Sequence, residues 1–182
     1  MKTKAILVLF SISSCGMATA ADYAVKDGST LEFIGTFQGE EFQGRFDRFD
    51  ASIRYDPAQL GDSKFDVSID LASASTGDSE RDVLLPDKEF FAVAEHPKAQ
   101  FVTSQFHKSG DKIVAEGTLS LKGISEPVEL ELTFVPDATG ATLDVLANMN
   151  RLEFKVGTGD YADTSTIGDE VKIQAHLILE PK

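Results

Sequence analysis

Apolar and polar residues alternate along most of this chain. Phe65, Val67 and Ile69, for example, are separated by Asp66 and Ser68. Such an alternation places the apolar side chains on one face of a β-strand. We therefore predict an all-β fold, with strands in the runs 31–37, 42–46, 49–55, 65–71, 113–121, 128–134, 143–149 and 171–179.

Turn-forming residues separate these runs. Asp56-Pro57, Lys122-Gly123 and Pro136-Asp137 each fall between two alternating segments, and such pairs favour turns. Short connections between consecutive strands favour an antiparallel meander. The alternation changes phase near Asp47-Arg48, and a phase change within one strand predicts a β-bulge that bends the sheet.

The segment from Ser73 to Pro97 departs from the alternation. Thr76 and Asp78 are candidate helix N-caps and Pro86 ends the helical pattern, so we predict a short helix followed by a turn. Strands with one apolar face must close or stack to hide that face, and closure also removes exposed edges. The predicted fold is a closed antiparallel barrel of about eight strands, with a short helical segment near residues 73–97.

The alternation does not determine which face of the barrel points inward. A barrel of the outer membrane has an apolar outer face bounded by girdles of aromatic residues. This chain contains no Trp and only three Tyr, and it ends without an aromatic strand. We therefore favour a barrel whose apolar face points inward.

Small residues recur in the inward phase of the predicted strands. They either interleave with phenylalanine rings in a packed interior or leave an open tube. The residues alone favour the packed interior, and the tube remains the alternative. The small residues are Gly44, Ala51, Ala115, Gly117, Ala147 and Ala175.

The first twenty residues have the composition of a cleavable signal peptide. Lys2 and Lys4 precede a short apolar run, and Ala18-Thr19-Ala20 supplies a small-residue cleavage site. We predict secretion with cleavage after Ala20, which leaves a single domain over residues 21–182. The alternative is a lipoprotein anchored to the membrane through Cys15.

Charge and reactive residues exclude several classes of function. The formal net charge of −13 repels phosphate backbones, so we expect no nucleic-acid partner. The one cysteine excludes intrachain disulfides and cysteine-based zinc sites. The three histidines do not form a metal-binding motif, and the chain contains neither a phosphate-binding loop nor a nucleophile elbow. We therefore expect no enzymatic activity, no metal and no cofactor.

An ordered series of short motifs resembles the YceI-like family of exported, polyisoprenoid-binding, lipocalin-like proteins. The resemblance covers essentially all of the chain after the leader. Each motif alone is weak, but their order is specific. The motifs include Ser29-x-Leu-x-Phe33, Gly39-x-x-Phe-x-Gly44-x-Phe46, Arg81-Asp-x-x-Leu85, His96-Pro97-x-Ala-x-Phe101, Gly117-Thr-Leu-x-Leu-x-Gly-Ile-Ser-x-Pro-Val128 and Arg151-x-x-Phe154-x-Val-Gly157.

The resemblance implies a lipocalin-like barrel around a long apolar channel, in a protein of the bacterial periplasm. It also implies a long-chain amphiphile as ligand: a polyisoprenoid, an isoprenoid quinone or a fatty-acid derivative. Arg81 and Arg151 are candidates for head-group contacts, with structural ion pairing as their alternative role. The candidate lining residues are Phe33, Phe42, Phe46, Phe65, Phe101, Leu119, Leu121, Leu130, Phe134 and Phe154.

Two functions follow from these expectations. The first is a periplasmic carrier or sequestering protein for the amphiphile, and a homodimer that covers an apolar mouth is compatible with it. The alternative is an accessory protein that binds a membrane partner through a barrel filled by its own side chains.

Overall fold

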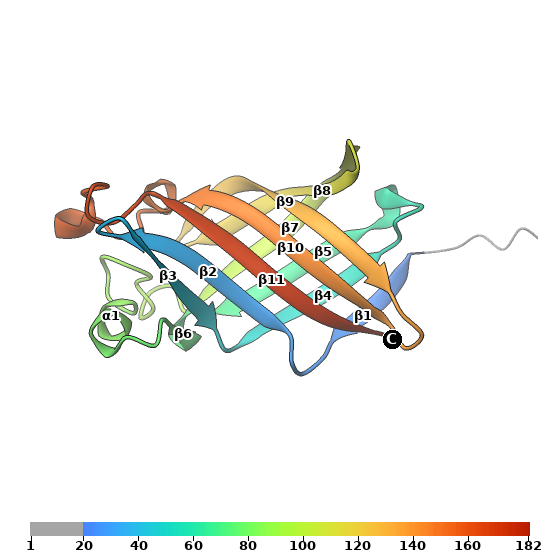
Figure 1. The fold of residues 1–182 in the computed structure, drawn as a ribbon, viewed down its shortest axis with the longest axis horizontal. Helices are drawn as coiled ribbons and strands as arrows, with labels where there is room; N and C mark the ends of the chain where they lie inside the picture. The colour runs from blue at the N-terminus through green and yellow to red at the C-terminus, as the bar shows by residue number, and fades with distance from the viewer. Residues whose placement is uncertain (1–19) are drawn as a thin grey trace, which may run out of the picture.

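The computed structural model describes residues 20–182, which form an elongated antiparallel β-barrel (Figure 1). The predicted signal peptide and the alternative anchor at Cys15 lie outside the described residues, apart from Ala20. The strands are β1 (Ala21–Val25), β2 (Thr30–Phe37), β3 (Glu40–Phe46), β4 (Phe49–Tyr55), β5 (Lys64–Asp70), β6 (Ala74–Ser75), β7 (Lys98–Ser109), β8 (Lys112–Leu121), β9 (Ile124–Pro136), β10 (Ala141–Asn150) and β11 (Glu170–Pro181).

One short α-helix, α1 (Ser79–Leu84), accompanies these strands within residues 20–182. Single turns of 3-10 helix occur at Leu60–Asp62, Leu71–Ser73, Arg151–Phe154 and Gly159–Tyr161. None of the helices in this part of the chain is long and apolar enough to cross a membrane.

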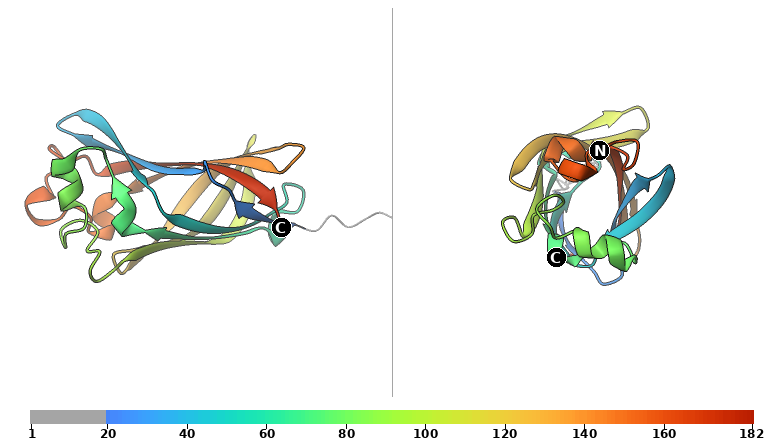
Figure 2. Two further views of the ribbon diagram at one scale, coloured as in Figure 1. Left: turned by 90° about the horizontal axis from the view of Figure 1, so that it is seen from below. Right: turned by 90° about the vertical axis from the view of Figure 1, so that its left-hand side faces the viewer.

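Eight strands form the closed ring, as the sequence predicts, in the order β1-β4-β5-β7-β8-β9-β10-β11. Pairing of β1 with the end of β11, from Tyr23↔Pro181 to Val25↔Leu179, closes the barrel. The β2–β3 hairpin pairs with the first half of β11 and extends the wall at the end that carries α1 (Figure 2). Closure satisfies the hydrogen-bonding groups at the strand edges, which an open sheet would leave free.

The predicted irregularity at Asp47-Arg48 is the bend between β3 and β4. The Asp47 amide donates to the carbonyl oxygen of Ser73 at 3.1 Å, and the Arg48 amide donates to the Ser73 hydroxyl at 3.0 Å. That hydroxyl donates in turn to the carbonyl oxygen of Asp70 at 2.6 Å. Ser73 is 5% exposed, so its bonds replace the ladder contacts that the bend interrupts.

Three strands, β1, β7 and the two-residue β6, are absent from the alternation-based prediction. In β7 the inward phase contains Thr103 as well as Phe101, and the register shifts between Thr103 and Gln105. A polar inward residue followed by a bulge removes the regular period of two on which the prediction depends.

The apolar phase of the strands faces the barrel interior, as the composition predicts. On β10, Leu143, Val145 and Ala147 are at most 8% exposed, whereas the intervening Leu146 is 50% exposed. The same alternation on neighbouring strands gives a continuous apolar inner surface. The hydrophobic free energy of folding therefore comes mainly from covering this surface.

Aromatic rings close the barrel at the end that carries the C-terminus. The Tyr55 and Phe134 ring centroids lie 4.9 Å apart, and those of Phe65 and Phe106 lie 5.0 Å apart. Tyr23 packs edge-on against Phe134 at 5.8 Å. We call these five residues the aromatic plug, since their rings occupy the interior at this end.

A second buried cluster contains Leu85, the residue that follows α1, and lies at the opposite end of the barrel. Figure 2 shows α1 and its flanking loops at that end. This cluster packs residues at the ends of β7 and β8 against residues of the segment that follows α1. It is separate from the buried cluster that contains residues of the aromatic plug. We call it the lid cluster; its buried members are Leu71, Leu85, Phe91, Ala99, Leu121 and Phe154.

Glycines on the inner wall lie directly beneath aromatic rings. A Cβ atom at Gly44 would come within 2.2 Å of Phe33 Cζ. A Cβ atom at Gly117 would come within 2.4 Å of Phe101 Cζ and 2.6 Å of the Val102 carbonyl oxygen. The two rings therefore lie against the wall instead of projecting across the lumen. The small residues do interleave with rings, but this packing leaves space along the barrel axis.

We predict that Gly117→Ala lowers the free energy of unfolding by about 1–3 kcal/mol, the usual cost of overpacking a core. The backbone oxygen of Val102 cannot yield to the new methyl group as a side chain would. Chemical denaturation measures the effect. Gly61→Ala is the matched control, because nothing lies within 4 Å of its added Cβ. Equal stability of the two variants would contradict this explanation of the inner wall.

Candidate functional site

A cavity of about 450 Å³ occupies the barrel between the aromatic plug and the lid. Phe65 belongs to both the plug and the cavity lining, so it marks the floor. At the other end the lining includes residues of α1 and of the segment 156–168. This volume lies within the range of small-molecule sites.

Most of the lining residues that the sequence predicts come together around this cavity. These residues reach the cavity from β2, β3, β5, β7, β8 and β9, and Arg81 reaches it from α1. Arg151 also lies at the cavity wall. The predicted residues that line the cavity are Phe33, Phe42, Phe46, Phe65, Phe101, Leu119, Leu121, Leu130, Arg81 and Arg151.

Phe134 and Phe154 do not line the cavity, which corrects their proposed position. Phe134 belongs to the aromatic plug, where it packs against Tyr23 and Tyr55. Phe154 is fully buried in the lid cluster. Phe134 follows the inward apolar pattern of its strand, but the pattern does not state how far along the axis a side chain lies. Phe154 was proposed from the Arg151-x-x-Phe154 motif, and it lies in a turn of 3-10 helix beyond β10.

Several lining residues are missing from the sequence prediction although they carry the same signal. β10 and β11 contribute alternating inward residues, including Val145, Met149 and Ile173. The alternation alone predicts that the side chains of these residues point inward. Asp78 and Glu80 also line the cavity, but no periodicity places a short helix over a barrel mouth.

The mouth of the cavity carries the charged groups of its lining. Among the lining residues that the structure describes, the charged ones are Asp78, Glu80, Arg81 and Arg151. The rest of the wall is almost entirely aliphatic and aromatic. The cavity is therefore an apolar tube with polarity confined to one end.

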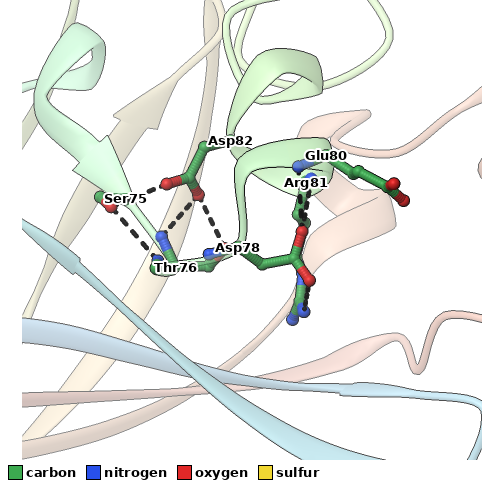
Figure 3. A network of polar contacts seen from close by, with 7 residues as sticks. Ser75, Thr76, Asp78, Glu80, Arg81 and Asp82 are labelled. Atoms are coloured by element: carbon green, nitrogen blue, oxygen red, sulfur yellow. Dashed lines mark hydrogen bonds and ion pairs between the residues drawn. The ribbon is translucent and has the colours of Figure 1, made fainter.

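Asp78 organises the start of α1 (Figure 3). Its Oδ1 accepts hydrogen bonds from the amides of Glu80 and Arg81 at 3.0 and 3.1 Å. Its Oδ2 accepts from Arg81 Nη2 at 3.3 Å. The bonds from the Arg81 amide and then from its guanidinium lower the pKa of Asp78, so this carboxyl group is ionised at neutral pH.

Arg81 has the structural ion pair that we gave as its alternative role. Besides bonding Asp78, its guanidinium carbon lies 4.3 Å from the centroid of the Phe42 ring. This cation–π contact joins α1 to the β2–β3 hairpin across the mouth. The Arg81 side chain is still 31% exposed, so it remains accessible at the rim.

Asp82 attaches α1 to the barrel wall at β6 (Figure 3). Its carboxylate accepts from the Ser75 hydroxyl at 2.8 Å, and from the amide and hydroxyl of Thr76 at 2.6 and 2.7 Å. Burial alone would raise the pKa of Asp82, but the hydrogen bonds from Thr76 and Ser75 outweigh it and lower the pKa. The helix is thus held by charge-assisted hydrogen bonds.

Arg151 is a structural residue of the mouth, and it contacts backbone instead of a carboxylate. It is 4% exposed, and each of its five N–H groups meets a carbonyl oxygen. Nε donates to the carbonyl oxygen of Gly168 at 2.9 Å. Nη1 donates to the carbonyl oxygens of Val156 and Gly157 at 2.9 and 2.6 Å. Nη2 donates to those of Tyr161 and Ile167 at 3.0 and 2.8 Å. One side chain therefore shapes the whole loop between β10 and β11.

The loop between β10 and β11 also contacts the loop that follows α1. The amides of Gly157 and Thr158 donate to the Glu89 carbonyl oxygen at 2.7 and 3.1 Å, and the Phe90 and Tyr161 rings pack at 4.8 Å. Gly157 has φ +70°, and a Cβ there would lie 2.4 Å from Arg151 Nη1. The arginine and the glycine thus depend on each other.

Comparison with known proteins agrees with this architecture. The model of the YceI-like domain matches residues 23–179. The chain belongs to the YceI-like family. It is 34% identical over 129 residues to the UPF0312 protein of Pseudomonas savastanoi, covering 68% of this chain and 67% of that protein.

Two solved structures show the same fold as this chain. BcnA of Burkholderia cenocepacia superposes with a TM-score of 0.80 at 31% identity, over 84% of this chain and 98% of BcnA. A polyisoprenoid binding domain of Saccharophagus degradans, implicated in plant cell wall breakdown, superposes with a TM-score of 0.66 at 19% identity. That match covers 90% of this chain and 99% of the domain.

We predict that Arg151→Lys destabilises the mouth. A lysine donates at most three hydrogen bonds, so at least two buried carbonyl groups lose their partner, each at about 1–3 kcal/mol. Denaturation and amide hydrogen exchange over 151–168 measure the loss. Arg45→Lys is the control, because the Arg45–Asp47 pair is 65% and 51% exposed and such pairs contribute little. Unchanged exchange in the Arg151 variant would refute the structural role.

Acidification should release α1 from the wall. Because the pKa values of Asp78 and Asp82 are lowered from 3.8 in the fold, their stabilisation is complete above that value and is lost as pH falls through the folded pKa. The protection of the amides of residues 79–84 against hydrogen exchange, taken relative to the intrinsic rate at each pH, should fall below pH 3.8. In Asp82→Asn, exchange should already be fast at pH 7. Slow exchange in that variant would contradict the anchoring role of Asp82.

Proposed function

We propose that this protein binds one long-chain amphiphile in its barrel, as a carrier or sequestering protein. The observation that supports the proposal is the apolar cavity between the aromatic plug and the lid, with charge only at its mouth. The ligand would lie with its alkyl or prenyl chain along the axis and its polar end near α1. Because the similar Saccharophagus structure is a polyisoprenoid binding domain, an isoprenoid chain is the first class of ligand to test.

The physical chemistry of burial supports this mode of binding. Each CH₂ group removed from water contributes about 0.8 kcal/mol, so a tail of roughly sixteen carbons contributes on the order of 13 kcal/mol. Association opposes this with an estimated 4–15 kcal/mol. Useful affinity therefore requires near-complete enclosure of the tail but few polar contacts, and the lining matches that requirement.

The same cavity favours a binding role over the two competing functions. A partner-binding barrel filled by its own side chains is the less favoured alternative, since the packing is confined to the plug and lid ends. Catalysis would require an acid, base or nucleophile near a bound ligand. Of the carboxylates of this region, Asp78 serves as the cap of α1 and Asp82 as its anchor.

The proposed setting is the bacterial periplasm, where a long-chain amphiphile needs a carrier to cross water between membranes. The support comes from the leader sequence, with Lys2, an apolar run and Ala18-Thr19-Ala20. Anchoring through Cys15 is the alternative. N-terminal analysis of the mature protein separates them, since cleavage after Ala20 removes the cysteine.

Filling the cavity should abolish uptake of a lipid without unfolding the protein. Ala147 lines the cavity, while its neighbour Leu146 is 50% exposed on the outer face. We expect Ala147→Phe to lose binding of radiolabelled geranylgeraniol by at least tenfold, because the new ring occupies tail volume, roughly two methylenes' worth or more. Leu146→Phe is the matched control on the same strand and should bind as the wild type does.

Circular dichroism and thermal unfolding establish that both variants fold. Equal binding by the two folded variants would mean that the lipid lies outside the barrel. A wild-type protein that takes up no geranylgeraniol, isoprenoid quinone or fatty acid would contradict the proposed function itself.

A further inference from the structure

The charge arrangement at the mouth determines which polar end a ligand can carry. We propose that the barrel selects amphiphiles with an uncharged polar end, such as an alcohol or a quinone, and excludes those that end in a carboxylate or a phosphate. This inference rests on the proposed function, because it assumes that a tail occupies the cavity.

The first argument is that both arginines of the lining are already committed. All five N–H groups of Arg151 donate to backbone carbonyl oxygens, so none is free for a ligand oxygen. Arg81 pairs with Asp78 at 3.3 Å and lies over the Phe42 ring. An anionic head group at Arg81 would have to share this guanidinium with the Asp78 carboxylate, which is held in place by the amides of Glu80 and Arg81.

The second argument concerns the start of α1, where free amides would otherwise attract an anion. The Asp78 carboxylate already accepts from the amides of Glu80 and Arg81. The helix therefore presents a carboxylate to the mouth where an uncapped helix would present N–H donors. The N–H groups that could bind an anion at this end of α1 already donate to the Asp78 carboxylate.

The third argument is the sign of the remaining charge. Within the lining, the carboxylates of Asp78 and Glu80 balance the guanidinium groups of Arg81 and Arg151, so any excess of charge comes from the residues around the mouth. A second, smaller hollow shares Leu84, Phe90 and Tyr161 with the cavity and is otherwise lined by Asp87, Glu89, Gly159 and Asp160. A phosphate at the mouth would thus approach an excess of carboxylates, and like charges at short range disfavour binding.

Three ligands with the same C20 tail test the inference: geranylgeraniol, geranylgeranoic acid and geranylgeranyl phosphate. Each competes with radiolabelled geranylgeraniol for the full protein at pH 7.4 in low salt. We expect the alcohol to bind about tenfold or more tightly than either anion, and the difference to shrink at high salt because the mouth is partly exposed.

Variants of the mouth locate the effect. Asp78→Asn combined with Glu80→Gln should reduce the difference in affinity between the alcohol and the two anions, because Arg81 then has no carboxylate partner. Asn at position 78 still caps the helix. Asp111→Asn combined with Glu129→Gln removes the same two types of acid from the β7–β8 turn and from β9. This control should retain the wild-type preference.

The outcomes separate the two proposals. If none of the three ligands binds to folded protein, the proposed function fails and the head-group inference fails with it. If all three bind equally, or if the phosphate binds most tightly, the barrel is a lipid-binding protein but its mouth does not exclude anions. If the control pair changes the preference as much as the mouth pair does, the net charge of the protein and not the mouth is responsible, which overturns the inference.

Discussion

The structure depends on the requirement that a single apolar face of an eight-stranded sheet be removed from water. Pairing of β1 with β11 meets this requirement geometrically, because it closes the sheet into a tube. Closure alone leaves a lumen that must be filled. At one end the aromatic plug fills it, and at the other α1 and the loop around Arg151 cover it. The cavity is what remains between these two closures, and a bound tail would complete the burial of its wall.

The polar groups of the molecule act mainly to hold this arrangement in place. Ser73 stabilises the bend between β3 and β4, Asp82 fixes α1 to the wall, and Arg151 shapes the loop at the mouth. Each group is engaged with backbone or with a neighbouring side chain. The polar residues at the mouth thus make a rigid rim, and the energy of binding would come from the apolar wall.

Most of the fold was predictable because the period of two identifies inward residues directly. That signal located the strands around Phe33, Phe65 and Leu130 and most of the cavity lining. It did not locate β7, where Thr103 and a register shift break the period. It also placed Phe134 in the cavity, because alternation gives the face of a strand but not the depth along the axis. Phe154 was proposed from a motif, and it lies in a turn of 3-10 helix that packs under the lid. The ion pair of Arg81 with Asp78 is local and was one of the expected alternatives. The contacts of Arg151 with carbonyl groups depend on the path of the loop between β10 and β11, which no local pattern contains.

The central claim is that the cavity holds one long-chain molecule. Native mass spectrometry of the protein purified from its own cells, without detergent, tests this most directly. The account predicts a single added mass per chain that corresponds to a long-chain lipid and disappears after extraction with organic solvent. Folded protein that shows only its own mass, and gains none after incubation with isoprenoid alcohols, quinones or fatty acids, would contradict it.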